Sequence, residues 1–213
     1  MANKPKVTRF EPEHYFEISG VKYQGGIHTY RLYDKMTDSM NQDELAEFYE
    51  TEKKKGNPHP MNSILHFSIF DSAVKSENAD LLNQIQNGLN KFPNTLSRVI
   101  YNSLGNDEVI HNYGTSDAYS LNGNIVGEDN WIKNIKDKKS LELLTGVKDI
   151  NKLDKISDAI NKTPMHLWRI NSKSSEKQER VVVRFKSYYD RLSLFASWDL
   201  SVRGPAFRVL QVD

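Results

Sequence analysis

The chain of 213 residues contains no cysteine. Without thiols it can form neither disulfides nor thiolate zinc sites, and it cannot use a cysteine nucleophile. Long apolar runs are also missing, and none approaches the roughly 20 residues that span a bilayer. Residues 1–9 are positively charged, but no apolar segment follows them, so we predict no signal peptide. We therefore expect a protein without a membrane span that is cytoplasmic or associated with a larger particle.

An excess of either charge is missing as well. The sequence holds 29 lysines and arginines against 28 acidic residues, which gives a formal net charge of +1. A dedicated nucleic-acid binder normally carries a basic excess or a basic stripe, so we predict no nucleic-acid partner. The mean hydropathy of −0.66 is typical of a globular protein with polar segments. The length allows one sizeable core, and we predict a single domain over residues 1–213.

The common signatures of metal sites and catalytic centres do not occur in the sequence. Asp34, Asp38 and Asp43 do not alternate as the oxygen ligands of a calcium loop do. Gly25 and Gly26 are followed by neither a lysine–serine pair nor a helix, which a phosphate-binding loop requires. The histidines lack the spacing of a helical metal pair. They are His14, His28, His59, His66, His111 and His166. We therefore predict no metal, no cofactor and no catalytic residue.

His66 nevertheless leaves a catalytic alternative open. It lies in the sequence Leu65-His-Phe-Ser-Ile69. A His-x-Ser sequence on a strand is typical of one half of a two-histidine phosphoesterase site, where the imidazoles act as acid and base. The second such sequence is missing, so a small hydrolase or phosphoesterase would need another histidine brought close by the fold. A further alternative is a structural component of a viral particle that uses its sheet for assembly.

Strand patterns cluster at the two ends of the chain. Residues 14–19 and 27–33 flank a glycine-rich turn, which predicts a hairpin. In the C-terminal part we expect a strand at 165–170. An antiparallel meander is predicted for the segments 181–185, 192–200 and 206–212.

The middle of the chain is more mixed. Asn41-Gln-Asp-Glu44 has the spacing of a helix capping box, and a second helix is expected to begin near Asn78. The apolar segment 62–70 is interpreted as a buried strand. Residues 96–104 fit either a helix or a strand, and the polar residues 105–130 are interpreted as a loop.

Residues 131–162 change character and are rich in lysine and aspartate, with leucine and isoleucine at helical spacing. Ser140 is expected to cap a short helix there, and Gly146 to end it. We interpret this segment as a helical insertion. Strands at both ends with helices between them predict an α+β domain whose antiparallel sheet joins the N- and C-terminal segments.

Residues 191–201 carry the most informative pattern, because they alternate strictly between the two sides of an extended chain. One side is uniformly apolar and consists of Leu192, Leu194, Ala196, Trp198 and Leu200. The other side mixes charges, hydroxyl groups and an aromatic ring, and consists of Arg191, Ser193, Phe195, Ser197, Asp199 and Ser201. A merely solvated face seldom exposes phenylalanine, so we interpret this second side as a display face that binds a ligand.

Three segments near the C-terminus share a pattern with a known family. They are Arg180-Val-Val-Val-Arg-Phe185, Arg191-Leu-Ser-Leu-Phe-Ala-Ser-Trp198 and Gly204-Pro-Ala-Phe-Arg-Val209. They resemble the variable region of C-type-lectin-fold proteins that a diversity-generating retroelement alters. The resemblance implies a C-type-lectin-like fold whose last strand pairs with the N-terminal strand. Residues 180–213 would then be the variable-region-like segment.

The resemblance also implies a function, which is non-catalytic binding of a protein or glycan ligand through an adaptable surface. In that family, positions encoded by adenine-containing codons vary because the template is copied unfaithfully. The matching positions here are Tyr188, Tyr189, Asp190, Ser193, Phe195, Ser197, Asp199, Ser201 and Arg203. Changes at such surface positions typically alter stability by only about half a kcal/mol, so a rigid sheet can tolerate them.

Overall fold

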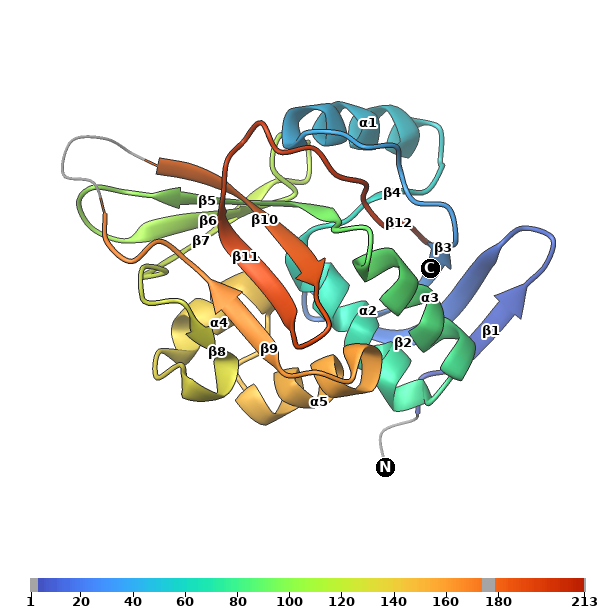
Figure 1. Cartoon of the computed structure of the whole chain (residues 1–213). Coiled ribbons are helices and arrows are strands. Elements are labelled where there is room, and N and C mark those ends of the chain that lie inside the picture. The colour runs from blue at the N-terminus through green and yellow to red at the C-terminus, as the bar shows by residue number, and fades with distance from the viewer. Residues whose placement is uncertain (1–3, 174–178, 213) are drawn as a thin grey trace.

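The computed structural model describes residues 4–173 and 179–212, and these residues form two sheets with helices between and around them (Figure 1). In spatial order, the first sheet contains β1 (Val7–Phe10), β2 (Tyr15–Tyr23), β3 (Gly26–Tyr33), β12 (Arg208–Gln211) and β4 (His59–Pro60). The second contains β7 (Tyr119–Gly123), β6 (Asp107–His111), β5 (Asn94–Tyr101), β10 (Glu179–Ser187), β11 (Leu192–Trp198), β9 (Met165–Trp168) and β8 (Asn130–Trp131). The α+β class predicted from the sequence is therefore confirmed.

The first sheet joins the two ends of the chain. β2 and β3 form the predicted antiparallel hairpin, with Gln24 and Gly25 at positive φ in its turn. β12 pairs antiparallel with β3, where Val209 lies opposite Leu32, and β4 pairs with the other side of β12. The prediction that N- and C-terminal strands share one antiparallel sheet is confirmed.

The C-terminal meander is correct for two of its three strands. β10 and β11 pair antiparallel in the second sheet, but β12 crosses to the first sheet. Phe207 explains this change, because its ring is buried beside His66 and Phe70 of the helix that separates the two sheets. The alternation of a short strand predicts which side is buried but does not identify the partner strand.

Helices fill the space behind and between the sheets. They are α1 (Gln42–Lys54), α2 (Ser63–Ser76), α3 (Ala79–Leu89), the 3-10 helix η1 (Ile132–Asn134), α4 (Lys138–Thr145) and α5 (Ile150–Asn161). The capping box at Asn41 and Glu44 is present, and Asn78 caps α3, as predicted. The helical nature of 131–162 is also confirmed, and Gly146 ends α4 in a left-handed conformation. The cap of α4 is Asp137 rather than Ser140, whose hydroxyl lies one turn inside the helix.

The segment 62–70 is helical, so the predicted strand is wrong. The side chain of Asn62 accepts a hydrogen bond from the Leu65 amide and begins α2. α2 lies between the sheets and is apolar on several sides, so it lacks the one-sided stripe that identifies a surface helix. A short apolar run of this kind cannot be distinguished from a buried strand by its periodicity.

Two further segments, 96–104 and 105–130, contribute strands to the second sheet. Residues 96–104, which fit either state, contribute to β5, and all eight residues of β5 are buried. Residues 105–130 are not a loop throughout, because β6 and β7 form an antiparallel pair there. In β6 the buried residues Asp107, Val109 and His111 alternate with the half-buried Glu108 and Ile110, and high polarity hides strands that have one solvated side.

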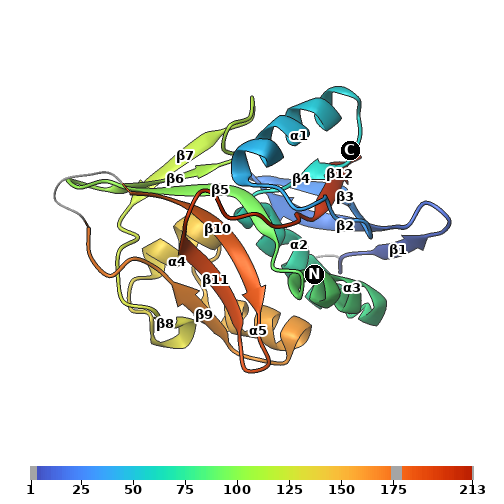
Figure 2. The same ribbon diagram turned by 45° about the horizontal axis from the view of Figure 1, so that its top comes forward.

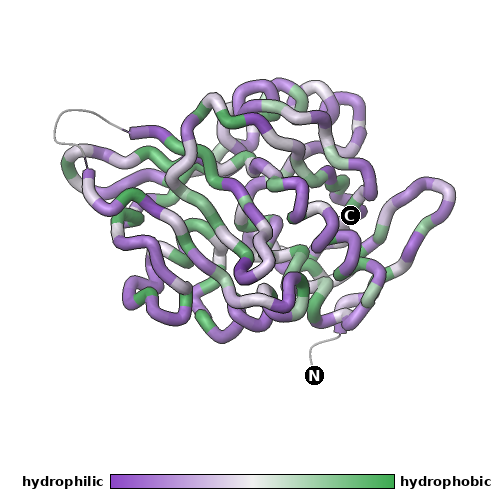
Figure 3. The backbone as a smooth tube through the Cα atoms, viewed as in Figure 1, coloured by the Kyte–Doolittle hydropathy of each residue, from purple (hydrophilic) through white to green (hydrophobic). Residues whose placement is uncertain are grey.

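One hydrophobic core connects both sheets through α2. Phe67 and Phe70 of α2, Phe185 of β10 and Phe207 all lie in this cluster and are almost completely buried. Figure 3 shows apolar residues through the middle of the molecule and hydrophilic ones around its outer turns. The core therefore covers one side of β10 and β11, and the other side of these strands faces away from it.

Candidate functional site

β11 lies between β10 and β9, and its inner side matches the sequence prediction. Leu192, Leu194 and Ala196 are buried in the main core. Opposite them is the outer face of the second sheet. Among the described residues no helix covers this face over β9, β10 and β11, because α4 and α5 pack behind the sheet (Figures 1 and 2). The predicted display face is thus part of an uncovered sheet surface.

Trp198 lies on this outer face, so its predicted place in the core is wrong. Phe195 pairs with Arg184 and Trp198 pairs with Val182, which leaves β11 one residue longer than β10 between the two pairs. This β-bulge shifts the alternation by one residue. The half-buried indole consequently packs against Phe195 and Arg184. Leu200 is half-buried just beyond the end of the strand.

A row of aromatic rings crosses the outer face. Trp168 of β9 stacks on Phe195, with ring centroids 5.5 Å and planes 9° apart. Phe195 meets Trp198 edge-on, also at 5.5 Å. Beyond Trp168 the row continues with His166 at 4.7 Å and Trp131 at 5.0 Å from His166. Stacked and edge-on ring pairs are stabilising beyond the area that they bury, so this row is a rigid platform.

Three cations lie along the same row. The guanidinium of Arg184 is 4.9 Å from the Trp198 ring centroid. The ammonium of Lys186 is 4.7 Å from the Tyr188 ring, and the guanidinium of Arg191 is 5.1 Å from it. Cation–π attraction holds all three against the rings. We call these residues the aromatic face, in which Arg184, His166 and Phe195 are buried and the other six are half-buried. They are Trp131, His166, Trp168, Arg184, Lys186, Tyr188, Arg191, Phe195 and Trp198.

Two of the predicted ligand-binding residues are buried inside this arrangement. Ser193 is completely buried, and its hydroxyl accepts a hydrogen bond of 3.2 Å from Trp168 Nε1. Phe195 is only 7% exposed, because Trp168 and Trp198 flank it. Both point to the outer side, as predicted, but they support the platform and are not displayed on it. Larger neighbours on the adjacent strands cover them, which the pattern of a single strand cannot reveal.

The turn between β10 and β11 presents the predicted residues that are most accessible. The Tyr188 amide donates a 2.8 Å hydrogen bond to the Arg191 carbonyl and closes the turn. Tyr189 is fully exposed, and Asp190 is exposed beside Arg191. Tyr188 and Tyr189 line a pocket of about 530 Å³ together with Phe92. This turn therefore offers an accessible aromatic edge to the aromatic face.

The remaining predicted residues lie at the opposite end of β11. Ser197 is half-buried, and Asp199 and Ser201 are exposed. Asp199 accepts a hydrogen bond of 2.7 Å from the Ser201 amide, and hydrogen bonds from Ser201 lower the pKa of this carboxyl group. Arg203 reaches Glu44 Oε1 at 2.8 Å and the Ser39 carbonyl at 2.9 Å, so it attaches the crossing segment to α1.

Sequence reasoning missed the residues that neighbouring strands contribute. Arg184 and Lys186 alternate with the core residue Phe185 on β10, and His166 and Trp168 alternate with Leu167 on β9. The period-two pattern was therefore visible in both segments. Only the order β10-β11-β9 shows that their outer sides join the outer side of β11.

The geometry around His66 does not support the catalytic alternative. His66 is completely buried on α2, and its ring contacts Phe70, Phe185 and Phe207. Its Nδ1 lies 2.8 Å from the Asn62 carbonyl, and burial lowers its pKa to about 4. A substrate cannot reach this imidazole without opening the core.

Comparison with known proteins gives no relative: no family model matches the chain, and no curated protein or solved structure is significantly similar to it. Across residues 4–173 and 179–212, no helix is long and apolar enough to cross a membrane. The same residues contain no cluster of three histidine or acidic side chains that could hold a metal ion.

Proposed function

We propose that this protein is a non-catalytic binding protein that recognises a protein partner through its aromatic face. The observation that carries the proposal is the row of rings with interleaved cations on an uncovered sheet. Tryptophan, tyrosine and arginine supply most of the binding energy at protein interfaces. Rings that already contact one another lose little conformational freedom on binding, which favours affinity.

Charge indicates the chemistry of the partner. Lys186 Nζ lies near the rings of Phe92, Tyr188 and Trp198, and it forms no ion pair within the described part of the chain. A carboxylate of the partner can pair with this ammonium at the centre of the contact. The partner is therefore an acidic protein segment with apolar side chains that cover the rings.

The proposal also includes the scaffold and its variability. The scaffold is C-type-lectin-like, and the pairing of β12 with β3 supports this because it closes the chain end to end. The predicted positions that are exposed or half-buried, apart from Arg203, which is bonded to α1, would then be the diversified ones, and Tyr188 among them also belongs to the aromatic face. They are Tyr188, Tyr189, Asp190, Ser197, Asp199 and Ser201.

The DNA of this locus in sister strains tests the diversification. Substitutions should concentrate at the accessible positions, while Ser193 and Phe195 stay constant because they are buried. An imperfect repeat of the segment encoding 180–212, differing at template adenines, should lie nearby with a reverse transcriptase gene. Equal variation at accessible and buried positions, without such a repeat, would refute this part of the proposal.

A phage-displayed random peptide library tests the binding face. Peptides enriched on the protein should be acidic and apolar, and Lys186→Glu should abolish their binding because it repels the carboxylate. The matched control is Lys138→Glu, a reversal at an exposed lysine of α4 behind the sheet, which should leave binding intact. If no peptide is enriched, and a glycan array instead yields a neutral glycan that binds both variants equally, the acidic protein partner is excluded.

A further inference from the structure

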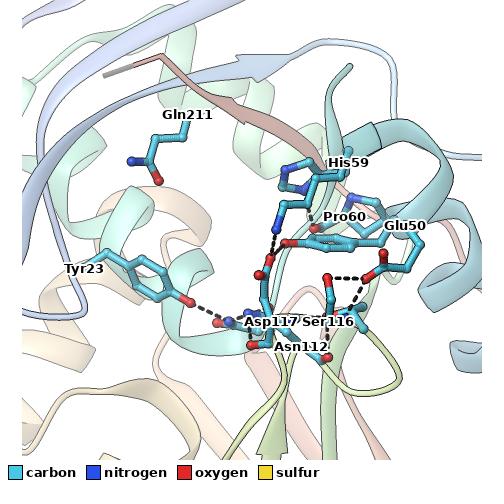
Figure 4. A network of polar contacts seen from close by, with 12 residues as sticks. Tyr23, Glu50, His59, Pro60, Asn112, Ser116, Asp117 and Gln211 are labelled. Atoms are coloured by element: carbon cyan, nitrogen blue, oxygen red, sulfur yellow. Dashed lines mark hydrogen bonds and ion pairs between the residues drawn. The ribbon is translucent and has the colours of Figure 1, made fainter. Parts of the chain in front are cut away.

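A second hollow lies away from the aromatic face, where the first sheet meets the turn between β6 and β7. It has a volume of about 560 Å³. We call it the polar pocket, and its principal lining residues are Tyr23, Tyr49, Lys53, His59, Asp117 and Tyr119. In Figure 4, Tyr23 and Gln211 lie across from His59 and Asp117. Its volume is within the range of about 300–1,000 Å³ that small-molecule sites occupy.

The wall formed by the β6–β7 turn is fixed in place. Tyr49 of α1 donates a 2.5 Å hydrogen bond to Asp117, and Lys53 forms an ion pair with the same carboxylate. Glu50, which follows Tyr49 on α1, accepts hydrogen bonds from both the amide and the hydroxyl of Ser116, at 2.6 and 2.8 Å. The pocket is thus already formed without a ligand, which favours binding.

The floor is organised by an amide network. Asn62 donates from its side-chain nitrogen to the Tyr23 hydroxyl at 2.7 Å and to Asn112 Oδ1 at 2.8 Å. Tyr23 accepts this hydrogen bond and keeps its own hydroxyl proton for donation, and Tyr119 also lines the pocket. Burial raises the pKa of the Tyr119 hydroxyl, so the phenol stays protonated and remains a donor.

His59 supplies an acceptor on the opposite wall. Its Nδ1 lies 3.2 Å from the Pro60 carbonyl oxygen. Because a carbonyl oxygen only accepts hydrogen bonds, Nδ1 carries the ring proton and is the donor. Nε2 then carries the lone pair. Burial lowers the pKa of His59, which keeps the ring neutral near pH 7. The ring is also held at 4.3 Å from the Tyr49 ring.

The charges of the polar pocket cancel. Lys53 and Asp117 neutralise each other, and hydrogen bonds from Lys53 and then Tyr49 lower the pKa of the Asp117 carboxyl group. Burial and the bond to Asp117 raise the pKa of Tyr49, so this phenol is neutral too. A charged ligand would find no unpaired countercharge on these walls, whereas hydroxyl groups find both donors and acceptors between aromatic rings.

We infer that the polar pocket binds a neutral ring compound with several hydroxyl groups, such as a sugar or the sugar moiety of a nucleoside. The phenol rings contact the faces of the ligand ring. Tyr23, Tyr119 and His59 Nε2 exchange hydrogen bonds with its hydroxyl groups. This site is independent of the aromatic face and of the protein partner proposed for it.

Saturation-transfer NMR with the full chain tests this inference. The probes are neutral mono- and disaccharides, neutral nucleosides, and their phosphorylated and carboxylated counterparts, each at millimolar concentration. A neutral sugar or nucleoside should receive saturation from the protein, and its charged counterpart should bind at least tenfold more weakly. The sugar and nucleoside arms identify which of the two carries the recognised ring.

Three variants locate the binding. His59→Phe keeps the ring beside Tyr49 but removes the acceptor, and Tyr23→Phe removes a hydroxyl; each should raise Kd about tenfold, the effect of losing one hydrogen bond to a ligand. His14→Phe, at an exposed histidine that does not line the pocket, is the matched control and should leave Kd unchanged. Thermal melts verify that all three fold.

Two results would overturn the inference. One is that none of the neutral compounds receives saturation. The other is that binding occurs but is insensitive to both pocket variants while they remain folded. Loss of peptide binding by Lys186→Glu with intact sugar binding would leave both proposals standing as separate sites.

Discussion

Phe195 illustrates how residues on one side of a strand can have opposite roles. It supports the aromatic face from within, whereas Tyr189 at the adjacent turn is fully exposed. Phe195→Ala should lower the free energy of unfolding by about 3 kcal/mol, because it leaves a cavity between Trp168 and Trp198. Tyr189→Ala should change it by no more than about 0.5 kcal/mol. Urea unfolding of the two variants measures both values, and equal effects would contradict the burial described.

His66 and His111 make the protein sensitive to acid. Burial lowers the pKa of each to about 4, while the unfolded chain titrates near 6.5. Above pH 6.5 both states hold neutral imidazoles, and stability is complete. Between pH 6.5 and 4 only the unfolded state takes up the proton, so each histidine should lower the free energy of unfolding by about 3 kcal/mol across this interval.

Urea unfolding at pH 7 and pH 4.5 measures this loss. His66→Phe preserves an aromatic ring beside Phe70 and Phe185. In this variant the free energy of unfolding should fall less between pH 7 and pH 4.5, because the contribution of His66 is removed. His14→Phe, at an exposed histidine, is the control and should retain the full slope. Identical slopes in all three proteins would show that His66 does not carry the effect.

The sequence predicts the side of a strand better than it predicts burial. The core positions Leu192, Leu194 and Ala196 follow from alternation alone, because the two sides of β11 differ in polarity. Ser193 and Phe195 were expected to be accessible, but rings from β9 and the bulged end of β11 cover them. Exposure on a central strand depends on both neighbours, and sequence order does not provide their identity.

At the scale of elements, the turn between β6 and β7 is held closely against α1. Gly114 has a φ of +74°, and a Cβ there would lie 2.8 Å from the Ala46 Cβ. Gly105 has a φ of +78°, but a Cβ there would meet nothing within 4 Å. Gly105→Ala should lower the free energy of unfolding by about 1 kcal/mol, because alanine is less stable than glycine in the left-handed conformation. Gly114→Ala should lower it by about 1 to 2 kcal/mol more, because its methyl group also collides with Ala46. Thermal melts compare the Tm of the two variants. Equal decreases in Tm would show that the turn can move away from α1 without loss of stability.

Elements with capping residues were predicted well, and elements inside the molecule were not. Asn41 with Glu44 and Asn78 mark helix starts because their side chains hydrogen-bond to nearby amides, which is local chemistry. α2 has an equally local cap at Asn62, but its buried apolar surface resembles that of a strand. The bulge of β11 has no sequence signature here, since it is defined by pairing with β10.

At the scale of the whole molecule, the last strand is required for the core. Phe207 packs against Gly88 of α3, where an added Cβ would lie 2.3 Å from its ring. β12 also supplies the pairing partner for both β3 and β4. A chain that ends at Gly204 should lose cooperative thermal unfolding, because it exposes the core and leaves the edge of β3 unpaired. Circular dichroism during heating tests this, and a sharp transition near that of the full chain would contradict it.

The partnership between β3 and β12 also determines when the protein can fold during synthesis. Leu32 and Val209, which lie opposite each other, are near the two ends of the chain. On the ribosome the N-terminal hairpin therefore emerges long before its partner strand, and it presents an open edge while the residues between β3 and β12 are synthesised. The first sheet can be completed only after β12 has left the exit tunnel, and this step is slow because it relies on contacts distant in sequence.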